Sequence, residues 1–577
     1  MKASKKRGFT IVELVIVIAV IAILAAVLIP TFANIIQKAN VANDVALARN
    51  MNTILIADEA TNGKSTDMYD VLIALEQGGF KLENLNPRAD GNVFAWDKAN
   101  NQIVYLDKKN PDKPIFQAKE IGNNKGDLYI TTRKAEVFAD YPGYSYYFAS
   151  DISGDITLDE GSCLDTGEFA LNGNVIVNTK KDVEIHGTIN GTITVDSPSG
   201  KITNYSVVNN VVIVNTAPTS YHERGHVAAM EIQNSLKGKV VLENDAYVEK
   251  LTNNKTNGTV ESKGYVKAVE GSDTSVTATQ SGYVMEIGTY DQLVNFRNKV
   301  NAGASYSGMT VKLTADIDIS ERAWTPIGAA YRDKIDANAK VFQGTFDGQG
   351  HKITGLTNTG FKISSAFKGS NSTTPAGYSE YVFGLFGSVY NATIKNIVMA
   401  NVNVDLACDE KEKVVGDSVG AIVGFAAGDN NGVTIDSCKV ISGSIVGYDA
   451  VAGIIGRTYS ANTTISNCEN AATVTAIRRA SGILGFASLQ KGATSVAITD
   501  CKNSGNVKQT GTPTTDPAGK GQEGNYGYYM VAGLAIYQRT NSLDKVITIT
   551  GSTNTGTITL TVPAGEGKNK SDTVWYY

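Results

Sequence analysis

Cysteine and histidine are scarce in this sequence, with five and four copies among 577 residues. Five cysteines in a chain of this length do not form a disulfide framework, and the lack of any Cys-x-x-Cys pair argues against a structural zinc site. The histidines are His186, His222, His226 and His351. Only His222 and His226 have a spacing that suits a metal, and Gly225 between them favours a loop over a helix. We therefore expect no metal site and no cofactor.

The usual motifs of enzyme active sites are also missing. The sequence has no G-x-S-x-G, no H-E-x-x-H, no phosphate-binding glycine loop and no D-x-[DN]-x-[DN]-G calcium loop. The best carboxylates are Asp316 and Asp318, on one side of an expected strand, and Asp347, which precedes Gly348 in a predicted turn. We expect that the chain is not an enzyme. A polysaccharide-active surface, which needs clustered acidic and basic residues, stays open as an alternative.

Proline is scarce at 12 residues, whereas glycine is abundant at 57. Together with plentiful Val, Ile and Thr, this composition favours many short strands joined by Gly and Asn turns. The net charge of -5 argues against a nucleic-acid partner. A length of 577 residues predicts several domains.

One long apolar run stands near the N-terminus, unbroken from Leu14 to Ile29. As a helix, residues 9–29 would cover about 30 Å, the hydrocarbon thickness of a bilayer. The basic residues in 2–7 should keep the N-terminus in the cytoplasm and send the remaining chain outward. Glu13 does not fit an ordinary anchor, because a carboxylate there costs about 2.5 to 3.5 kcal/mol.

The order of a basic leader ending in Gly8, then Phe9, then Glu13 and an apolar run resembles the prepilin signal of type IV pilins and related pseudopilins. The resemblance implies that a prepilin peptidase cuts between Gly8 and Phe9 and N-methylates Phe9. It also implies that the freed, largely cationic amine of Phe9 neutralises Glu13 of a neighbouring subunit during assembly. A simple signal anchor would explain the charges and the apolar run but not Glu13.

Helical periodicity continues after Pro30 to about residue 60, with polar residues such as Lys38, Asp44 and Arg49 between the apolar ones. In pilins this half of the helix packs against a small sheet. Residues 61–136 suit that role, because they contain a predicted short helix ending at Gly78-Gly79 and a predicted hairpin in NVFAWDKANNQIVYLD. This part resembles the reduced pilin headgroup of Gram-positive bacteria.

From residue 137 to 288 the sequence changes to V-x-V and I-x-V triplets about ten residues apart, separated by Asn or Gly. The pattern favours strands stacked in parallel as a β-solenoid. A β-sandwich would show similar alternation, so it stays open for this region.

Two elements alternate after residue 308. The first occurs as GLFG at Gly384, AIVG at Ala421, GIIG at Gly453, GILG at Gly482 and GLAI at Gly533. The second follows each time, as in VTIDSCKVISGSI. They resemble the GLUG repeat of β-helical adhesin-like proteins, and the preceding TVKLTADIDIS resembles the opening of a right-handed parallel β-helix. The bracketed apolar pairs are expected on strands that share one core, and they are Ile422 and Val423, Ile454 and Ile455, and Ile483 and Leu484.

Alignment of the second element predicts a column of residues in successive repeats, formed by Ile397, Cys438, Cys468, Cys501 and Ser552. Free cysteine is often fully buried, so a stack of small side chains is one interpretation. The other is disulfides between strands about 4.8 Å apart. Side chains in register on parallel strands seldom give the dihedral angle that a disulfide needs, which favours reduced, buried thiols.

A short helix is predicted directly before the first β-helix strand. Thr289 and Gln292 form a capping box, and Gly303 supplies the C-terminal stop. The predicted apolar stripe consists of Leu293, Phe296 and Val300, with Asp291, Arg297 and Lys299 off the stripe. We predict that this helix plugs the N-terminal end of the 304–577 solenoid and separates it from 137–288.

These patterns predict a mainly β protein, with a long N-terminal transmembrane or pilin helix, a small α+β headgroup, and parallel β-helix (β-solenoid) regions with a short capping helix. The predicted segments are a prepilin leader at 1–8, a pilin transmembrane and assembly helix at 9–60, a small pilin-like headgroup at 61–136, a first β-solenoid-like region at 137–288, a capping helix at 289–303 and a GLUG-repeat parallel β-helix at 304–577.

The resemblances imply a minor or tip subunit of a type IV pilus or pilus-like filament, displaying an adhesin-like domain. The implied partners are prepilin peptidase, other pilin subunits through the N-terminal helix, the membrane before assembly, and an unknown surface ligand that is a carbohydrate or a protein. Single-pass membrane location before transfer to an extracellular filament or the cell surface would follow. Two alternatives stay open beside the enzyme one: a membrane-tethered surface protein and a type II secretion pseudopilin-like protein.

Overall fold

The computed structural model describes residues 11–561 and 574–576. Within that range it leaves out residues 66, 81–84, 123, 134, 160, 256–258, 280–281, 321, 329, 331–334, 337, 359–367, 370–378, 409–413, 489–494, 513–528 and 539–545. The chain forms two compact units. The first comprises Met1–Tyr221, Ile232–Lys239 and Thr256–Gly258, and the second comprises His222–Glu231, Val240–Lys255 and Thr259–Tyr577.

The first unit begins with the helix α1 (Ile11–Asn62), which contains Pro30. A second helix, α2 (Met68–Gln77), starts at the N-cap Asp67, whose side chain accepts a hydrogen bond from the backbone of Asp70. It ends at Gly78, where the sequence predicted a stop. Both helices contribute to one core, which includes Met51, Leu55, Val71, Leu75, Trp96 and Tyr105.

Four strands follow, three of them in the predicted headgroup at 61–136 and the fourth just after it. Strands β1 (Val93–Asp97) and β2 (Gln102–Leu106) form an antiparallel hairpin, which confirms the predicted one. Its turn contains Asn101 at a φ of 50°, a left-handed conformation that Asn tolerates. Strand β3 (Leu128–Thr132) pairs antiparallel with β1 and parallel with β4 (Ser145–Phe148). Two short helices, η2 (Lys125–Asp127) and α3 (Glu136–Asp140), flank β3.

The rest of the first unit is built from parallel strands. They are β5 (Ile152–Ser153), β6 (Ile156–Leu158), β7 (Leu164–Asn172), β8 (Val175–Val177), β9 (Val183–Ile189), β10 (Ile193–Asp196) and β11 (Lys201–Asn204). One parallel ladder runs through β4, β7, β9 and β11, and another through β6, β8 and β10. A sandwich such as the immunoglobulin fold has antiparallel sheets, so this pairing argues against the sandwich alternative here. The unit boundary runs through the long strands β12 (Val207–Glu223) and β13 (His226–Leu242).

In the second unit, strands occur on both sides of the helix α4 (Tyr290–Ala302) in sequence. Before it come β14 (Tyr247–Asn253), β15 (Thr259–Ser262), β16 (Tyr265–Glu270) and β17 (Val284–Ile287). Strand β17 pairs in parallel with β18 (Thr310–Leu313), which follows the helix. This ladder therefore begins before α4 and not at residue 304, where the sequence predicted the start of the second β region.

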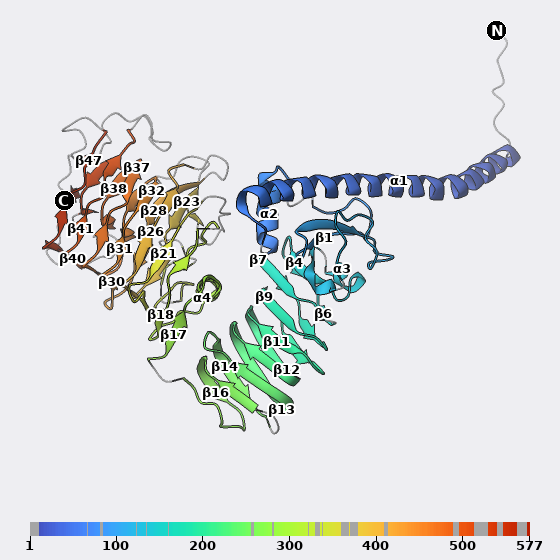
Figure 1. Cartoon of the computed structure of the whole chain (residues 1–577), viewed down its shortest axis with the longest axis horizontal. Coiled ribbons are helices and arrows are strands. Elements are labelled where there is room, and N and C mark those ends of the chain that lie inside the picture. Colours follow the sequence, from blue (N-terminus) through green and yellow to red (C-terminus); the bar gives the residue numbers. More distant parts are fainter. Residues whose placement is uncertain are drawn as a thin grey trace, which may run out of the picture. The chain divides into compact units, whose positions relative to one another are not determined.

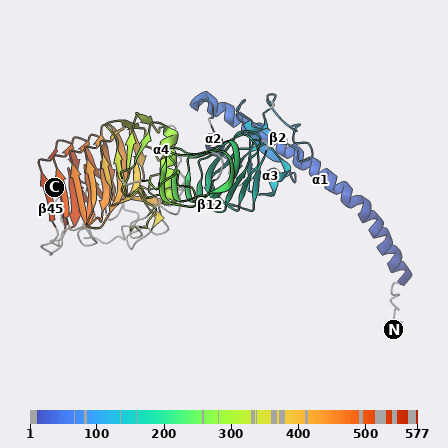
Figure 2. The same cartoon turned by 90° about the horizontal axis from the view of Figure 1, so that it is seen from below.

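Five sheets take one strand from each successive repeat of the second unit, and Figures 1 and 2 show these strands stacked side by side. Sheet I contains β17, β18, β20 (Thr345–Asp347), β25 (Thr393–Lys395), β30 (Val433–Asp436), β35 (Asn462–Ser466), β40 (Ser495–Thr499) and β45 (Val546–Thr550). Sheet II contains β19 (Ile317–Asp318), β21 (Lys352–Thr354), β26 (Val398–Ala400), β31 (Lys439–Val440), β36 (Glu469–Asn470), β41 (Lys502–Asn503) and β46 (Thr553–Asn554). Sheet III contains β27 (Val402–Asp405), β32 (Gly443–Gly447), β37 (Thr473–Ala476), β42 (Val507–Gln509) and β47 (Ile558–Thr559).

The other two sheets each include an antiparallel pair. Sheet IV contains β22 (Lys368–Gly369), β23 (Ser379–Phe383), β28 (Val414–Gly420), β33 (Ala450–Ala452), β38 (Arg479–Ser481) and β43 (Met530–Ala532). Sheet V contains β24 (Phe386–Tyr390), β29 (Val423–Ala427), β34 (Ile455–Thr458), β39 (Leu484–Ser488), β44 (Ala535–Gln538) and β48 (Val574–Tyr576). The pairs β22–β23 and β44–β48 are antiparallel, and the other pairs that join neighbouring strands in these two sheets are parallel.

The predicted cysteine column lies inside this stack. Its neighbours pair in register, Asp436 with Ser466 and Lys439 with Glu469, so Cys438, Cys468 and Cys501 occupy one position in successive repeats. All three are buried and free. The residue before each position in the column has a left-handed φ of 52° to 64°, and these residues are Asn396, Ser437, Asn467, Asp500 and Gly551.

The glycine-bracketed elements form bends between sheets IV and V. The six predicted apolar residues share one core and are fully buried, but Ile422, Ile454 and Ile483 lie in the bends and not on strands. The glycines explain this difference. A Cβ at Gly456 would lie 2.5 Å from the backbone nitrogen of Val419, so the backbones of the two sheets approach directly at this corner.

Candidate assembly helix and candidate surface sites

The first half of α1 is apolar on all sides and exposed. Leu14 is 54% exposed and Ile29 is 67% exposed. Glu13 lies in the first turn of the helix and is also exposed. The predicted cleavage residues Gly8 and Phe9 lie outside the described residues. Among the residues that are described, α1 is the one helix long and apolar enough to cross a membrane, by length and composition.

The second half of α1 is fixed to the headgroup by polar contacts. The buried carboxylate of Asp44 accepts hydrogen bonds from the backbone of Arg88 and Ala89, both at 2.9 Å, and from the hydroxyl of Tyr105 at 2.8 Å. Burial and the neighbouring Asp44 raise the pKa of Tyr105, which keeps this hydroxyl protonated as a donor. Asn52 both donates to and accepts from the backbone of Ile103, each at 2.8 Å.

Sequence reasoning placed Asp44 on the polar side of the helix, and the structure buries it. Its partners are backbone groups 44 and 45 residues further along the chain, so helical periodicity alone could not identify them. A buried carboxylate is tolerated because three donors replace its water. These contacts leave the two halves of α1 in different environments, one exposed and apolar, the other docked.

The carboxylates considered for catalysis serve local structure. Asp316 directly precedes β19 and Asp318 ends it, and both are exposed on either side of the buried Ile317, as expected for one side of a strand. Asp316 accepts a hydrogen bond from the backbone of Lys352 at 2.9 Å, and Asp318 accepts one from the backbone of Ser320 at 2.8 Å. These contacts lower the pKa of both carboxyls.

Asp347 is buried in its turn. Burial alone would raise the pKa of its carboxyl, but hydrogen bonds from Asn396 at 2.9 Å and from the backbone of Gln349 at 3.0 Å outweigh burial and lower it. Lys395 lies 3.3 Å away. The Asp347 turn is therefore tied to the next repeat.

The outward side of sheet I carries two regular columns. In one, charges of opposite sign alternate through paired positions, in the order Glu286, Lys312, Asp347, Lys395 and Asp436. In the other, threonines pair from strand to strand, in the order Thr310, Thr345, Thr393, Thr434 and Thr464. Opposite charges on paired positions stabilise this register against a slip by one residue.

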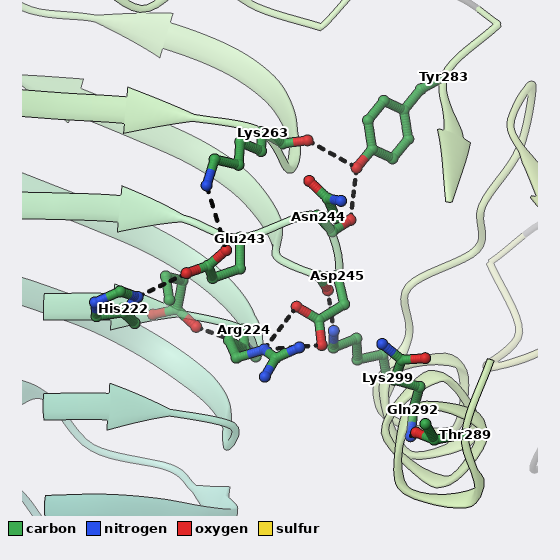
Figure 3. Close-up of polar contacts among 12 residues, drawn as sticks. His222, Arg224, Glu243, Asn244, Asp245, Lys263, Tyr283, Thr289, Gln292 and Lys299 are labelled. Carbon is green, nitrogen blue, oxygen red and sulfur yellow. Dashed lines mark hydrogen bonds and ion pairs between the residues drawn. The ribbon is translucent and has the colours of Figure 1, made fainter. Parts of the chain in front are cut away.

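The two histidines spaced i, i+4 lie on either side of a turn. His222 belongs to β12 and His226 begins β13, in agreement with the predicted loop. The Nδ1 atom of His222 lies 2.6 Å from Oε1 of Glu243 (Figure 3). The Nε2 atom of His226 lies 3.6 Å from Oε1 of Glu249. His226 and Lys267 lower the pKa of Glu249 to about 2. Among the described residues, no group of three or more His, Cys, Asp or Glu is placed to hold a metal ion.

Helix α4 packs its apolar stripe into the start of the sheets. Thr289 accepts a hydrogen bond from the backbone of Gln292 at 3.3 Å, and the Gln292 side chain accepts one from the backbone of Gly288 at 2.7 Å. The ring of Phe296 lies 5.0 Å from that of Tyr306 and 5.5 Å from that of Phe342. The helix therefore has the predicted caps and a buried apolar stripe.

Lys299 departs from the expectation for this helix, because it is buried. Its amine donates to the backbone carbonyl of Asp245 (Figure 3), and burial lowers its pKa to about 8. The Asp245 carboxylate accepts from Arg224 at 3.0 Å. Helix α4 thus contacts the strand ends around residue 245 as well as sheet I, and only the apolar part of this contact was visible in the sequence.

A buried ion-pair network lies between sheets IV and V. Arg457 donates to Asp417 and Asp449, both at 3.0 Å, and Arg479 lies 3.3 Å from Asp449. The Phe486 ring lies 5.2 Å from the Arg457 guanidinium carbon. These groups belong to three successive repeats, so the network links the repeats to one another.

Residues 3–29 match the family model of the prokaryotic N-terminal methylation motif. This match covers residues 3–8 of the predicted leader, Glu13 and the apolar run that forms the first half of α1. The N-terminal part of the chain is therefore type IV pilin-like.

Two relatives, both called type IV major fimbrial protein FimA, come from Dichelobacter nodosus. With the protein of strain VCS1703A the chain is 35% identical over 94 residues, 16% of this chain and 57% of the relative. With a second FimA it is 42% identical over 67 residues, 12% of this chain and 41% of the relative. The chain thus spans about half the length of the curated relatives it matches. No solved structure matches the chain significantly.

Proposed function

We propose that this chain is a structural subunit, minor or at the tip, of a type IV pilus or pilus-like filament, and that it displays an adhesin-like domain for attachment. The observation that carries the proposal is the division of α1. Its first half is apolar, exposed and part of a methylation motif, whereas Asp44 and Asn52 fix its second half to a folded headgroup.

The proposal assigns the N-terminal residues to processing and assembly. Prepilin peptidase cuts between Gly8 and Phe9 and methylates Phe9, while the apolar helix holds the chain in the membrane. The chain then leaves the membrane for the filament, where the Phe9 amine of one subunit neutralises Glu13 of another. Neutralisation removes the cost of a carboxylate in an apolar environment.

The remaining chain is the displayed part, and we assign the stack of sheets that begins at β17 and contains the repeats of residues 304–577 to a right-handed parallel β-helix of GLUG-type repeats. Support comes from the parallel register of successive repeats and from glycines that allow close backbone approach at each bend. We propose the segments 1–8, 9–60, 61–136, 137–288, 289–303 and 304–577 as functional divisions. The displayed domain binds a carbohydrate or protein ligand and carries out no catalysis.

A membrane-tethered surface protein or a secretion pseudopilin would use the same helix without adhesion by a pilus. A subunit of a surface filament and a membrane-tethered protein differ in where the mature chain is found. A subunit of a surface filament leaves with filaments sheared from cells, and a tethered protein stays with the membrane.

The test is mass spectrometry of the N-terminus of the chain recovered from a sheared surface fraction. We expect a mature chain that begins at methylated Phe9, and we expect Gly8→Val to keep residues 1–8 and to stay in the membrane fraction. Recovery of an uncut chain in sheared filaments would contradict the proposed processing. A cut chain that is found only in membranes would favour the tethered alternative.

A further inference from the structure

The inward-facing columns of the sheets end abruptly at the last described repeat. In sheet III one such column runs through Val404, Ile445, Val474, Val507 and Ile558. Its first four members are at most 1% exposed, whereas Ile558 is 45% exposed. Leu560, two residues further along the chain, is 39% exposed. The hydrophobic core is therefore open at this end as far as the described residues go.

At the same end, the last strands of three sheets have no paired neighbour among the described residues. Sheets I, II and III finish at β45, β46 and β47, and none of the described residues adds a further strand to them. Sheet V is different, because β48 pairs antiparallel with β44 and covers its edge. Unpaired strand edges beside exposed apolar side chains form a template for another strand.

The strand-edge segment of the last repeat, residues 546–561, also lacks charges. Residues 546–561, VITITGSTNTGTITLT, contain no Asp, Glu, Lys or Arg. Earlier repeats carry charges on the outward positions, including Lys395, Asp436, Glu469 and Lys508. Edge strands are normally protected from association by charged residues, above all lysine. Within residues 546–561 no charged side chain stands on the edge, and the segment is rich in β-branched residues that favour strand pairing.

We propose that the edge formed by residues 546–561 pairs with the same edge of a second copy of this chain. Around a two-fold axis the strands of the two copies run antiparallel, so a residue on one side of the axis opposes the residue equally far on the other side in the second copy. Because residues 546–561 carry no charge, their threonine and isoleucine side chains meet only uncharged side chains in such a pairing. The pairing covers Ile558 and Leu560 and gives the unpaired backbone groups partners.

The sequence offers no apolar cover of its own directly after this edge. Residues 562–573, VPAGEGKNKSDT, lie outside the described residues and contain one large aliphatic side chain, Val562. The self-association does not depend on pilus assembly, but on filaments it would link displayed domains of neighbouring filaments or cells.

The test uses the full chain reconstituted at one copy per lipid nanodisc, followed by sedimentation velocity over a range of concentrations. We expect pairs of discs to form as the concentration rises. Thr550→Lys adds a charge to the outward side of β45, in a column where Lys395 occupies an earlier repeat. It should weaken pairing at least about tenfold, because it brings a lysine from each copy into an edge that holds no opposite charge.

Thr464→Lys is the matched control, because it adds the same charge to an exposed outward position of sheet I two repeats before the edge. It should pair like the wild type. Amide hydrogen exchange of residues 546–561 should slow when discs pair and should stay fast in the monomer. A wild type that remains monomeric, equal pairing of Thr550→Lys and the wild type, or slow exchange of 546–561 in the monomer would each overturn the proposal.

Discussion

The apolar half of α1 and the core of the parallel sheets contain the same residue types, yet one is exposed and the other is buried. The difference comes from the pattern. Residues 14–29 are apolar at every position, so the helix has no polar face to turn outward. In sheet I, apolar residues such as Ile435 and Ile465 alternate with outward Thr and charged residues, so one face can be buried completely. The helix is adapted to an apolar environment outside its own fold, and the sheets are adapted to cover themselves.

The largest loss of stability is expected from Ile483→Asp in the buried core. The substitution leaves an unpaired charge without water among neighbouring repeats, at a cost above about 4 kcal/mol. Thermal unfolding and hydrogen exchange of the detergent-solubilised chain should show loss of structure in the adjoining repeats. Ile441→Asp, at a residue that is 46% exposed, is the control and should change stability little. An unchanged melting temperature for Ile483→Asp would mean that this core assignment is wrong.

Phe296→Ala tests how the sheets are closed at α4. Truncation removes a buried ring that contacts Tyr306 and Phe342, and it should cost about 3 to 5 kcal/mol with the cavity included. The exposed Asn298→Ala on the same helix should cost much less. Faster hydrogen exchange at Thr310–Leu313 in the Phe296 variant alone would support the packing, and equal exchange in both variants would exclude it.

Arg457→Met tests the ion pairs between sheets IV and V. Without Arg457, two buried carboxylates lose a partner, and we expect a loss of about 3 to 5 kcal/mol. Lys439→Met removes a comparable contact at the surface, 3.1 Å from Glu469, and should cost about 0 to 1 kcal/mol. Urea unfolding of the two variants measures the difference. Similar midpoints for both would show that the buried network adds no stability.

The smallest effect on stability is the pH dependence contributed by Glu249. Its pKa is lowered from 4.5 to about 2 in the folded chain, so the folded state binds this proton less readily than the unfolded state does. The resulting stability is fully present above pH 4.5 and is lost as the pH falls toward 2, by no more than about 3 kcal/mol. Glu249→Gln should flatten the stability profile between these limits. An identical profile for both chains would show that Glu249 contributes nothing to the pH dependence of stability.

Local patterns in the sequence predicted much of the architecture. The hairpin at 93–106, the caps of α4 and the cysteine column all depend on residues close together or repeated at a regular spacing, and each is present. What the sequence could not predict depends on distant partners. Asp44 and Lys299 are buried by contacts with backbone groups 44 to 54 residues away, and Ile483 lies in a bend because two sheets approach at glycines.

The central claim is that the exposed half of α1 serves assembly with other subunits through Glu13. The most direct measurement compares wild type, Glu13→Leu and the control Val15→Leu for their amounts in membranes and in filaments sheared from cells. We predict that all three chains enter the membrane, that Val15→Leu reaches filaments like the wild type, and that Glu13→Leu does not. Normal amounts of Glu13→Leu in sheared filaments would contradict it.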